Sequence, residues 1–169
     1  PVMARPGAAA NLITAGFGAI GVLTFSRIVR RLGLSSRLRR VIVLLFAINP
    51  GIVFYAINGM TDLILVVTLL AAVEGLWGYL ENGRLWGLLA SSIWLAIGFL
   101  TRYEAAFWAA VVAIALVLSL ARLSVPATSM RPHSSWIGGL VVLWLMPLVC
   151  ACTIWLFLNW MIMGNPLFF

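Results

Sequence analysis

The sequence is poor in charge: it contains no lysine and only four acidic residues, and charged residues make up 9% of its 169 residues. Soluble domains carry about a quarter charged residues, because a small globule has a large surface to cover. Hydrophobic residues make up 64% of the chain, and the mean hydropathy is +1.13. This composition excludes an ordinary soluble domain, a disordered tail and a collagen-like fibre. The class that remains is an integral membrane protein.

Cysteine and histidine are also scarce, with two cysteines and one histidine in the whole chain. The cysteines, Cys150 and Cys152, lie two positions apart inside an apolar run. On a helix such side chains point about 200° apart, so they cannot form a disulfide or share a metal ion. We interpret both as small apolar fillers. The sequence therefore implies no disulfide framework, and it shows no zinc pattern and no Ser-His-Asp set.

Six apolar runs follow one another along the chain. They cover about residues 9–29, 41–57, 63–80, 85–100, 105–121 and 136–158. About 20 helical residues cross the roughly 30 Å hydrocarbon core, and backbone groups in lipid must be hydrogen-bonded within their own segment. The second to fifth runs are short or marginal for a span. We predict an all-α fold: a polytopic transmembrane helix bundle of about six membrane helices, arranged largely as hairpins in one domain over residues 1–169.

The arginines gather in the loops after the first, third and fifth runs. These loops hold nine of the eleven arginines, namely Arg27, Arg30, Arg31, Arg37, Arg39, Arg40, Arg84, Arg122 and Arg131. Arg5 and Arg102 fall on the other side. By the positive-inside rule the side with nine arginines is cytoplasmic, where it meets anionic lipid head groups.

This charge distribution predicts a multi-pass protein of the bacterial plasma membrane with its N-terminal end outside. The arginines are not interleaved with stacking aromatics on an exposed face, so we expect no binding of nucleic acid.

Two motifs lie inside the apolar runs. Residues 16–21 match G-x-G-x-x-G, but no acid follows about twenty residues later, so the motif predicts close helix packing rather than a dinucleotide site. Asn49-Pro50-Gly51 interrupts the second run. Proline removes a helical hydrogen bond, so we predict a kink there; the alternative is a broken helix that opens a cavity toward Asn58 and Asp62.

Polar residues gather at the predicted outer ends of the runs. They are Asn58, Asp62, Arg102, Glu104, Asn159 and Asn165. Thr61 or Asp62 is expected to cap the third helix, because their side chains accept free amide hydrogens. Glu74 lies twelve residues past Asp62 in the same run, toward the inner side, and is expected to pair with an inner arginine or to snorkel.

Arg102 and Glu104 lie between two short apolar runs, in the segment Thr101-Arg102-Tyr103-Glu104. Charged residues at the membrane edge are costly unless they are paired, solvated or used in function. Two alternatives stay open for Arg102. It pairs with a neighbouring carboxylate at a hairpin tip, or it binds a phosphate through two parallel hydrogen bonds.

Three segments together resemble a known family. They are Asn49-Pro50 followed by residues 55–62, residues 100–105, and Asn159-Trp160 followed by residues 164–169. From about residue 26 to its end, the chain resembles the GT-C superfamily of polytopic membrane glycosyltransferases. That superfamily includes the protein mannosyltransferases and the bacterial lipid A aminoarabinose transferases. The resemblance implies transfer of a sugar from a polyprenyl-phosphate carrier to an acceptor on the outer face.

The resemblance also implies roles for individual residues. Arg102 would contact the carrier phosphate, and Asp62, Glu104 and Asn58 would bind substrate in the same cavity, with a divalent metal ion as a possible cofactor. The family's catalytic carboxylate usually lies in the first external loop. We expect this chain to begin after that loop, so that the catalytic base lies outside the segment.

Two other functions remain open. The first alternative is a non-catalytic transmembrane subunit of a larger membrane complex, which suits the small-residue helix faces and the incomplete site. The second is a transporter or flippase-like protein, which kinked helices favour. The expected partners are membrane lipids, a polyprenyl-phosphate-linked sugar and other membrane subunits.

Overall fold

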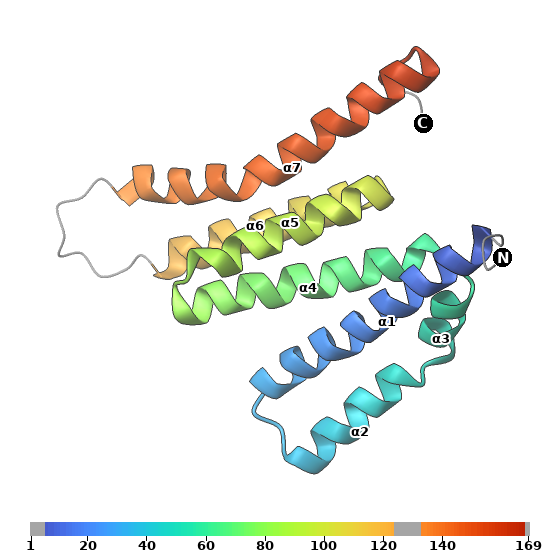
Figure 1. The fold of residues 1–169 in the computed structure, drawn as a ribbon. Coiled ribbons are helices and arrows are strands. Elements are labelled where there is room, and N and C mark those ends of the chain that lie inside the picture. Colours follow the sequence, from blue (N-terminus) through green and yellow to red (C-terminus); the bar gives the residue numbers. More distant parts are fainter. Residues whose placement is uncertain (1–5, 124–132, 168–169) are drawn as a thin grey trace.

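The computed structural model describes residues 6–123 and 133–167, and every regular element in these two ranges is an α-helix (Figure 1). The helices are α1 (Pro6–Arg31), α2 (Ser36–Ala47), α3 (Pro50–Ile57), α4 (Thr61–Asn82), α5 (Leu85–Thr101), α6 (Ala105–Leu123) and α7 (His133–Met163). The prediction of an all-helical fold is confirmed for these residues. Each predicted apolar run coincides with one helix, except the second, which forms two.

The second run is broken at the predicted place. Helices α2 and α3 meet at an angle of 46°. Pro50 occupies the first position of α3, and the Asn49 side chain caps this helix by accepting a hydrogen bond from the Gly51 amide at 2.9 Å. A proline at a helix start gives up an amide that has no partner in any case. The kink is therefore confirmed, and it is a capped break between two helices.

Helices α2 and α3 continue in the same sense with a bend, and the other successive helices run antiparallel (Figure 1). Helix α4 contacts α1, α3, α5 and α6, and helix α5 contacts α4, α6 and α7. Helices α4 and α5 thus form the centre of the bundle, with α1–α3 on one side and α6 and α7 on the other (Figure 1). The start of α4, the end of α5 and the start of α6 consequently lie at one end of the bundle.

Glycines allow the central helices to approach closely. A Cβ atom on Gly75 of α4 would lie 2.8 Å from the carbonyl oxygen of Gly87 in α5, and the reverse distance is also 2.8 Å. In α1, a Cβ on Gly21 would lie 2.7 Å from Val67 of α4. Gly21 closes the G-x-G-x-x-G motif, so its predicted role in close helix packing is confirmed.

A buried polar contact fixes α7 against α5. The side chain of Trp144 is fully buried in the hydrophobic core. Its indole N–H donates to the Ser91 hydroxyl at 3.4 Å, and the Ser92 hydroxyl donates to the Trp144 carbonyl. Both serines are also fully buried. Since unpaired buried polar groups are costly, these bonds specify the register of α7 on α5.

Three helices are long and apolar enough to cross a membrane. They are Ala9–Arg31, Thr61–Asn82 and Ile137–Met163, and the bent pair α2–α3 adds a fourth if it forms one span. Helices α5 and α6 are apolar but shorter. By length and composition, the described part of the chain therefore supports a membrane-embedded helical protein. The finer prediction of about six spans stays a prediction.

Candidate functional site

Arg102 joins two segments that are forty positions apart in the sequence. It is the C-cap residue of α5, and its Nη1 donates a hydrogen bond to the carboxylate of Asp62 in the first turn of α4. Its Nη2 donates to Glu104, just before α6, at 3.0 Å. The α4–α5 hairpin brings these residues together, because its two antiparallel helices have similar lengths. We call Asp62, Arg102 and Glu104 the carboxylate–arginine cluster.

The carboxylate–arginine cluster lies at the surface of the bundle end. The Arg102 side chain is 30% exposed, and both carboxylates are more exposed. With two carboxylates and one guanidinium, the cluster carries a formal charge of about −1. A guanidinium has five N–H donors, and two of those on Arg102 serve these ion pairs. Three donors remain for a further anionic or hydroxyl ligand.

Asn58 lies close to this cluster in sequence but not in contact with it. It is the exposed C-cap residue of α3, and its side-chain amide donates to the Phe54 carbonyl at 2.9 Å.

The prediction that Thr61 or Asp62 caps helix α4 is wrong. Met60 is the N-cap of α4, and no side chain caps that helix. Asp62 is instead the second residue of the helix, and its carboxylate is turned to Arg102.

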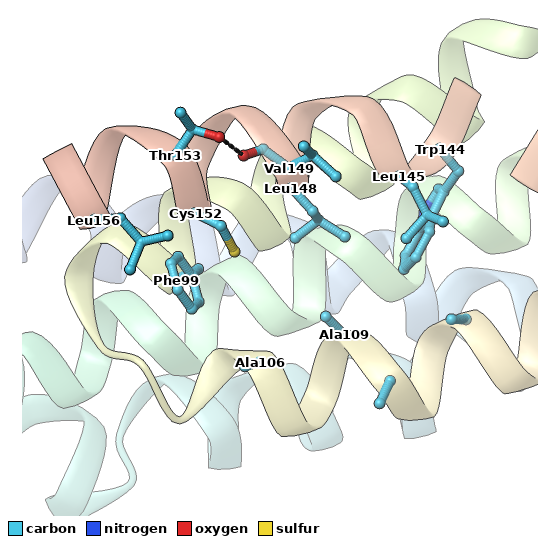
Figure 2. A pocket seen from close by; sticks show the side chains of 12 residues that line it. Phe99, Ala106, Ala109, Trp144, Leu145, Leu148, Val149, Cys152, Thr153 and Leu156 are labelled. Carbon is cyan, nitrogen blue, oxygen red and sulfur yellow. Dashed lines mark hydrogen bonds between the residues drawn. The ribbon is translucent and has the colours of Figure 1, made fainter. Parts of the chain in front are cut away.

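An apolar groove runs between α5, α6 and α7. Its main cavity has a volume of about 350 Å³ (Figure 2). A second cavity of about 310 Å³ shares Phe99, Ala106, Cys152 and Leu156 with the first and reaches Tyr103. Tyr103 lies between Arg102 and Glu104 in the sequence. The two cavities therefore adjoin each other and extend from Trp144 to Tyr103.

The groove was not predicted from the sequence, although a signal for it exists. Helix α6 contributes Ala106, Ala109, Ala110 and Ala113 to its wall. These positions follow the i, i+3, i+4, i+7 spacing, which places them on one helix face. Small side chains on that face leave space that α7 does not fill. Cys152 lines the groove from α7 (Figure 2), and both cysteines are free, as predicted.

A second ion-pair cluster lies toward the opposite end of the bundle. Arg31 donates to Glu74 at 2.9 Å and to Glu81 at 3.0 Å, which ties α1 to α4. The Arg31 guanidinium passes over Gly78, where a Cβ would lie 3.3 Å from its Nη2. The predicted pairing of Glu74 with an arginine that follows the first run is therefore confirmed. All four acidic residues of the chain are consequently engaged by Arg31 or Arg102.

The remaining predicted polar residues lie in α7 and in the turn that follows it. Asn165 caps its own turn, accepting from the Leu167 amide at 3.0 Å, and Asn159 is half-buried in α7. Arg5, Arg131 and the side chain of Arg122 lie outside the described residues. Within the described ranges, no three His, Cys, Asp or Glu side chains gather closely enough to hold a metal ion.

Comparisons of this chain with known protein families, with curated proteins and with solved structures found no match.

Proposed function

We propose that this chain is the membrane core of a GT-C-type glycosyltransferase, and that the carboxylate–arginine cluster binds the head group of a polyprenyl-phosphate-linked sugar. The observation that carries the proposal is the contact of Arg102 with Asp62 and Glu104. This contact unites residues 55–62 and 100–105, two of the segments on which the family resemblance rests.

The cluster has the donors and acceptors that such a head group needs. Asp62 and Glu104 hold the guanidinium in place, and its remaining N–H groups are available to phosphate oxygens. Exposed carboxylate oxygens can accept hydrogen bonds from sugar hydroxyls. In the transfer step an acceptor hydroxyl attacks the anomeric carbon, the bond from that carbon to the carrier phosphate breaks, and a carboxylate base outside this segment takes the hydroxyl proton.

The groove supplies a place for the hydrocarbon chain of the carrier. It is lined by alanine, leucine and aromatic side chains, and Tyr103, the sequence neighbour of Arg102, lines one end. Each buried methylene contributes about 0.8 kcal/mol to binding. A ligand with a long apolar chain and a phosphate at one end therefore matches both parts of the site.

The proposal includes a topology with about six membrane crossings, in which the cluster faces outward. The alternating helix directions in Figure 1 support it, because they separate the cluster from the arginine-rich ends of α1 and α2. The positive-inside rule then assigns those arginines to the cytoplasm.

A binding experiment on the full-length protein, reconstituted in nanodiscs, tests the proposal. We expect a long-chain polyprenyl phosphate to bind at least ten times more tightly than the matching polyprenol, and R102Q to abolish this difference. R84Q is the matched control, since Arg84, at the other end of α5, is exposed and forms no ion pair with any described residue. Equal binding of the phosphate and the alcohol, or an unchanged preference in R102Q, would contradict the proposal.

A non-catalytic membrane subunit is the second candidate function. It is favoured by the engagement of both carboxylates with Arg102, because such ion pairs also serve to fasten α4 to the α5–α6 turn. In that case R102Q would lower the stability of the protein and leave its affinity for polyprenyl phosphate unchanged. Measuring both quantities on the same variant distinguishes the two candidates.

A further inference from the structure

Within the described residues, five arginines near the junction of α1 and α2 have no acidic partner. All four acidic residues of the chain pair with Arg31 or Arg102. The arginines left over at this junction are Arg27 and Arg30 at the end of α1, and Arg37, Arg39 and Arg40 at the start of α2. We call these five residues the basic corner.

The fold holds the basic corner together. Only residues 32–35 separate α1 from α2, and the two helices turn back on each other (Figure 1). The rings of Phe25 and Phe46 stack with their centroids 4.3 Å apart, which fixes α2 along α1. The positive charges at the end of one helix therefore lie next to those at the start of the other.

The charge at the start of α2 is unfavourable within the chain itself. A helix N-terminus carries partial positive charge and is stabilised by acidic residues. Helix α2 has no acidic residue in its first turn and instead has three arginines among its first five residues. Local sequence rules broken in this way are typical of functional positions.

One face of α2 is apolar and uncovered. None of its residues is buried, and Leu38, Val41 and Leu45 are exposed on the face that also presents Arg37. This face thus combines guanidinium groups at one end with hydrocarbon side chains along the next two turns. A phospholipid has the same arrangement, with a phosphate at one end and acyl chains below it.

We propose that the basic corner is a binding site for an anionic phospholipid, whose phosphate lies among these arginines and whose acyl chains lie along the exposed face of α2. The site is separate from the carboxylate–arginine cluster, and the proposal does not depend on a transferase activity. It differs from general attraction to a charged membrane because it assigns the lipid to one helix pair.

Native mass spectrometry of the full-length protein tests the site. The probes are phosphatidylglycerol and phosphatidylcholine with identical acyl chains. One arginine near a membrane surface contributes about 1 kcal/mol, which is roughly fivefold in affinity. We expect the R37Q/R40Q variant to bind phosphatidylglycerol roughly 30-fold more weakly than the wild type. R37K/R40K should retain most of the affinity, and R84Q should equal the wild type.

Several outcomes would overturn the proposal. They are equal binding of the two lipids by the wild type, unchanged binding in R37Q/R40Q, and the same loss in R84Q. Displacement of the lipid by millimolar inorganic phosphate would mean that the corner binds free anions instead. If R37Q/R40Q does not fold, the proposal is tested by measuring how salt changes the binding of the two lipids to the wild type. We expect salt to remove the preference for phosphatidylglycerol and to leave phosphatidylcholine binding unchanged.

Discussion

The guanidinium of Arg102, at the end of α5, donates a hydrogen bond to the carboxylate of Asp62, at the start of α4. The two residues close the end of the α4–α5 hairpin, and Glu104 extends the contact to the start of α6 at 3.0 Å. Three helix ends therefore meet at one guanidinium. Truncation of any one of these side chains would affect both the charge of the site and the connection between the helices.

Replacing Asp62 by asparagine should separate charge from geometry. The D62N side chain keeps an oxygen that can accept from Arg102, but the cluster charge changes from about −1 to about 0. Because this removes repulsion of an anionic ligand, we expect affinity for polyprenyl phosphate to rise severalfold. The measurement is a binding titration in nanodiscs. The control is N58D, which adds a carboxylate at a residue outside the cluster. Weaker binding of polyprenyl phosphate in D62N would show that Asp62 itself holds the ligand.

Filling the groove should block the hydrocarbon chain without unfolding the bundle. Ala109 lines the cavity between α6 and α7, whereas Ala115 is exposed on the same helix. We expect A109F to weaken polyprenyl-phosphate binding at least tenfold and A115F to have no effect. Binding and thermal stability are to be measured together. A109F with normal affinity would show that the ligand chain lies elsewhere.

The close approach of α4 and α5 should not tolerate a side chain at Gly75. A Cβ there would lie 2.8 Å from one backbone atom and 2.9 Å from another, and backbone cannot move aside as a flexible side chain can. We expect G75A to destabilise the protein by about 1–3 kcal/mol in reversible unfolding in mixed micelles. G138A is the control, since a Cβ at that helical position meets nothing within 4 Å. It should be neutral or stabilising.

The two ion pairs of Arg31 should contribute unequally. The Glu74 side chain is 21% exposed, whereas that of Glu81 is 44% exposed. Solvent screens the more exposed pair, so we expect a coupling of about 0.5–1.5 kcal/mol for Arg31 with Glu74 and less for Arg31 with Glu81. Double-mutant cycles with R31Q, E74Q and E81Q measure both values. The reverse order would mean that accessibility does not set these energies.

The predictions from sequence were most successful where local rules decide the structure. The six apolar runs correspond to helices, and the break falls at Asn49-Pro50 because proline stops the preceding helix whatever surrounds it. The cap of α4 was predicted wrongly, because there a contact between residues distant in sequence opposes the local rule. Aspartate is favoured at helix N-caps, but an arginine forty positions later binds the carboxylate of Asp62.

The candidate site was predicted as a set of residue types, not as an arrangement. Pairing and phosphate binding were both open for Arg102, and the structure establishes pairing with Asp62 and Glu104. In the same structure the side-chain amide of Asn58 donates a hydrogen bond to the carbonyl of Phe54. The groove was missed, since an alanine-lined cavity exists only where the neighbouring helix fails to fill it.

The sequence by itself determined the all-helical, apolar character of this protein, the positions of its helices and the separation of its arginines from most of its polar residues. Composition and periodicity are properties of single segments, so they can be read without a partner. Only the tertiary structure decided which carboxylate meets which arginine, how closely α4 approaches α5, and where the groove lies. These features depend on contacts between residues distant in sequence, which no local pattern encodes.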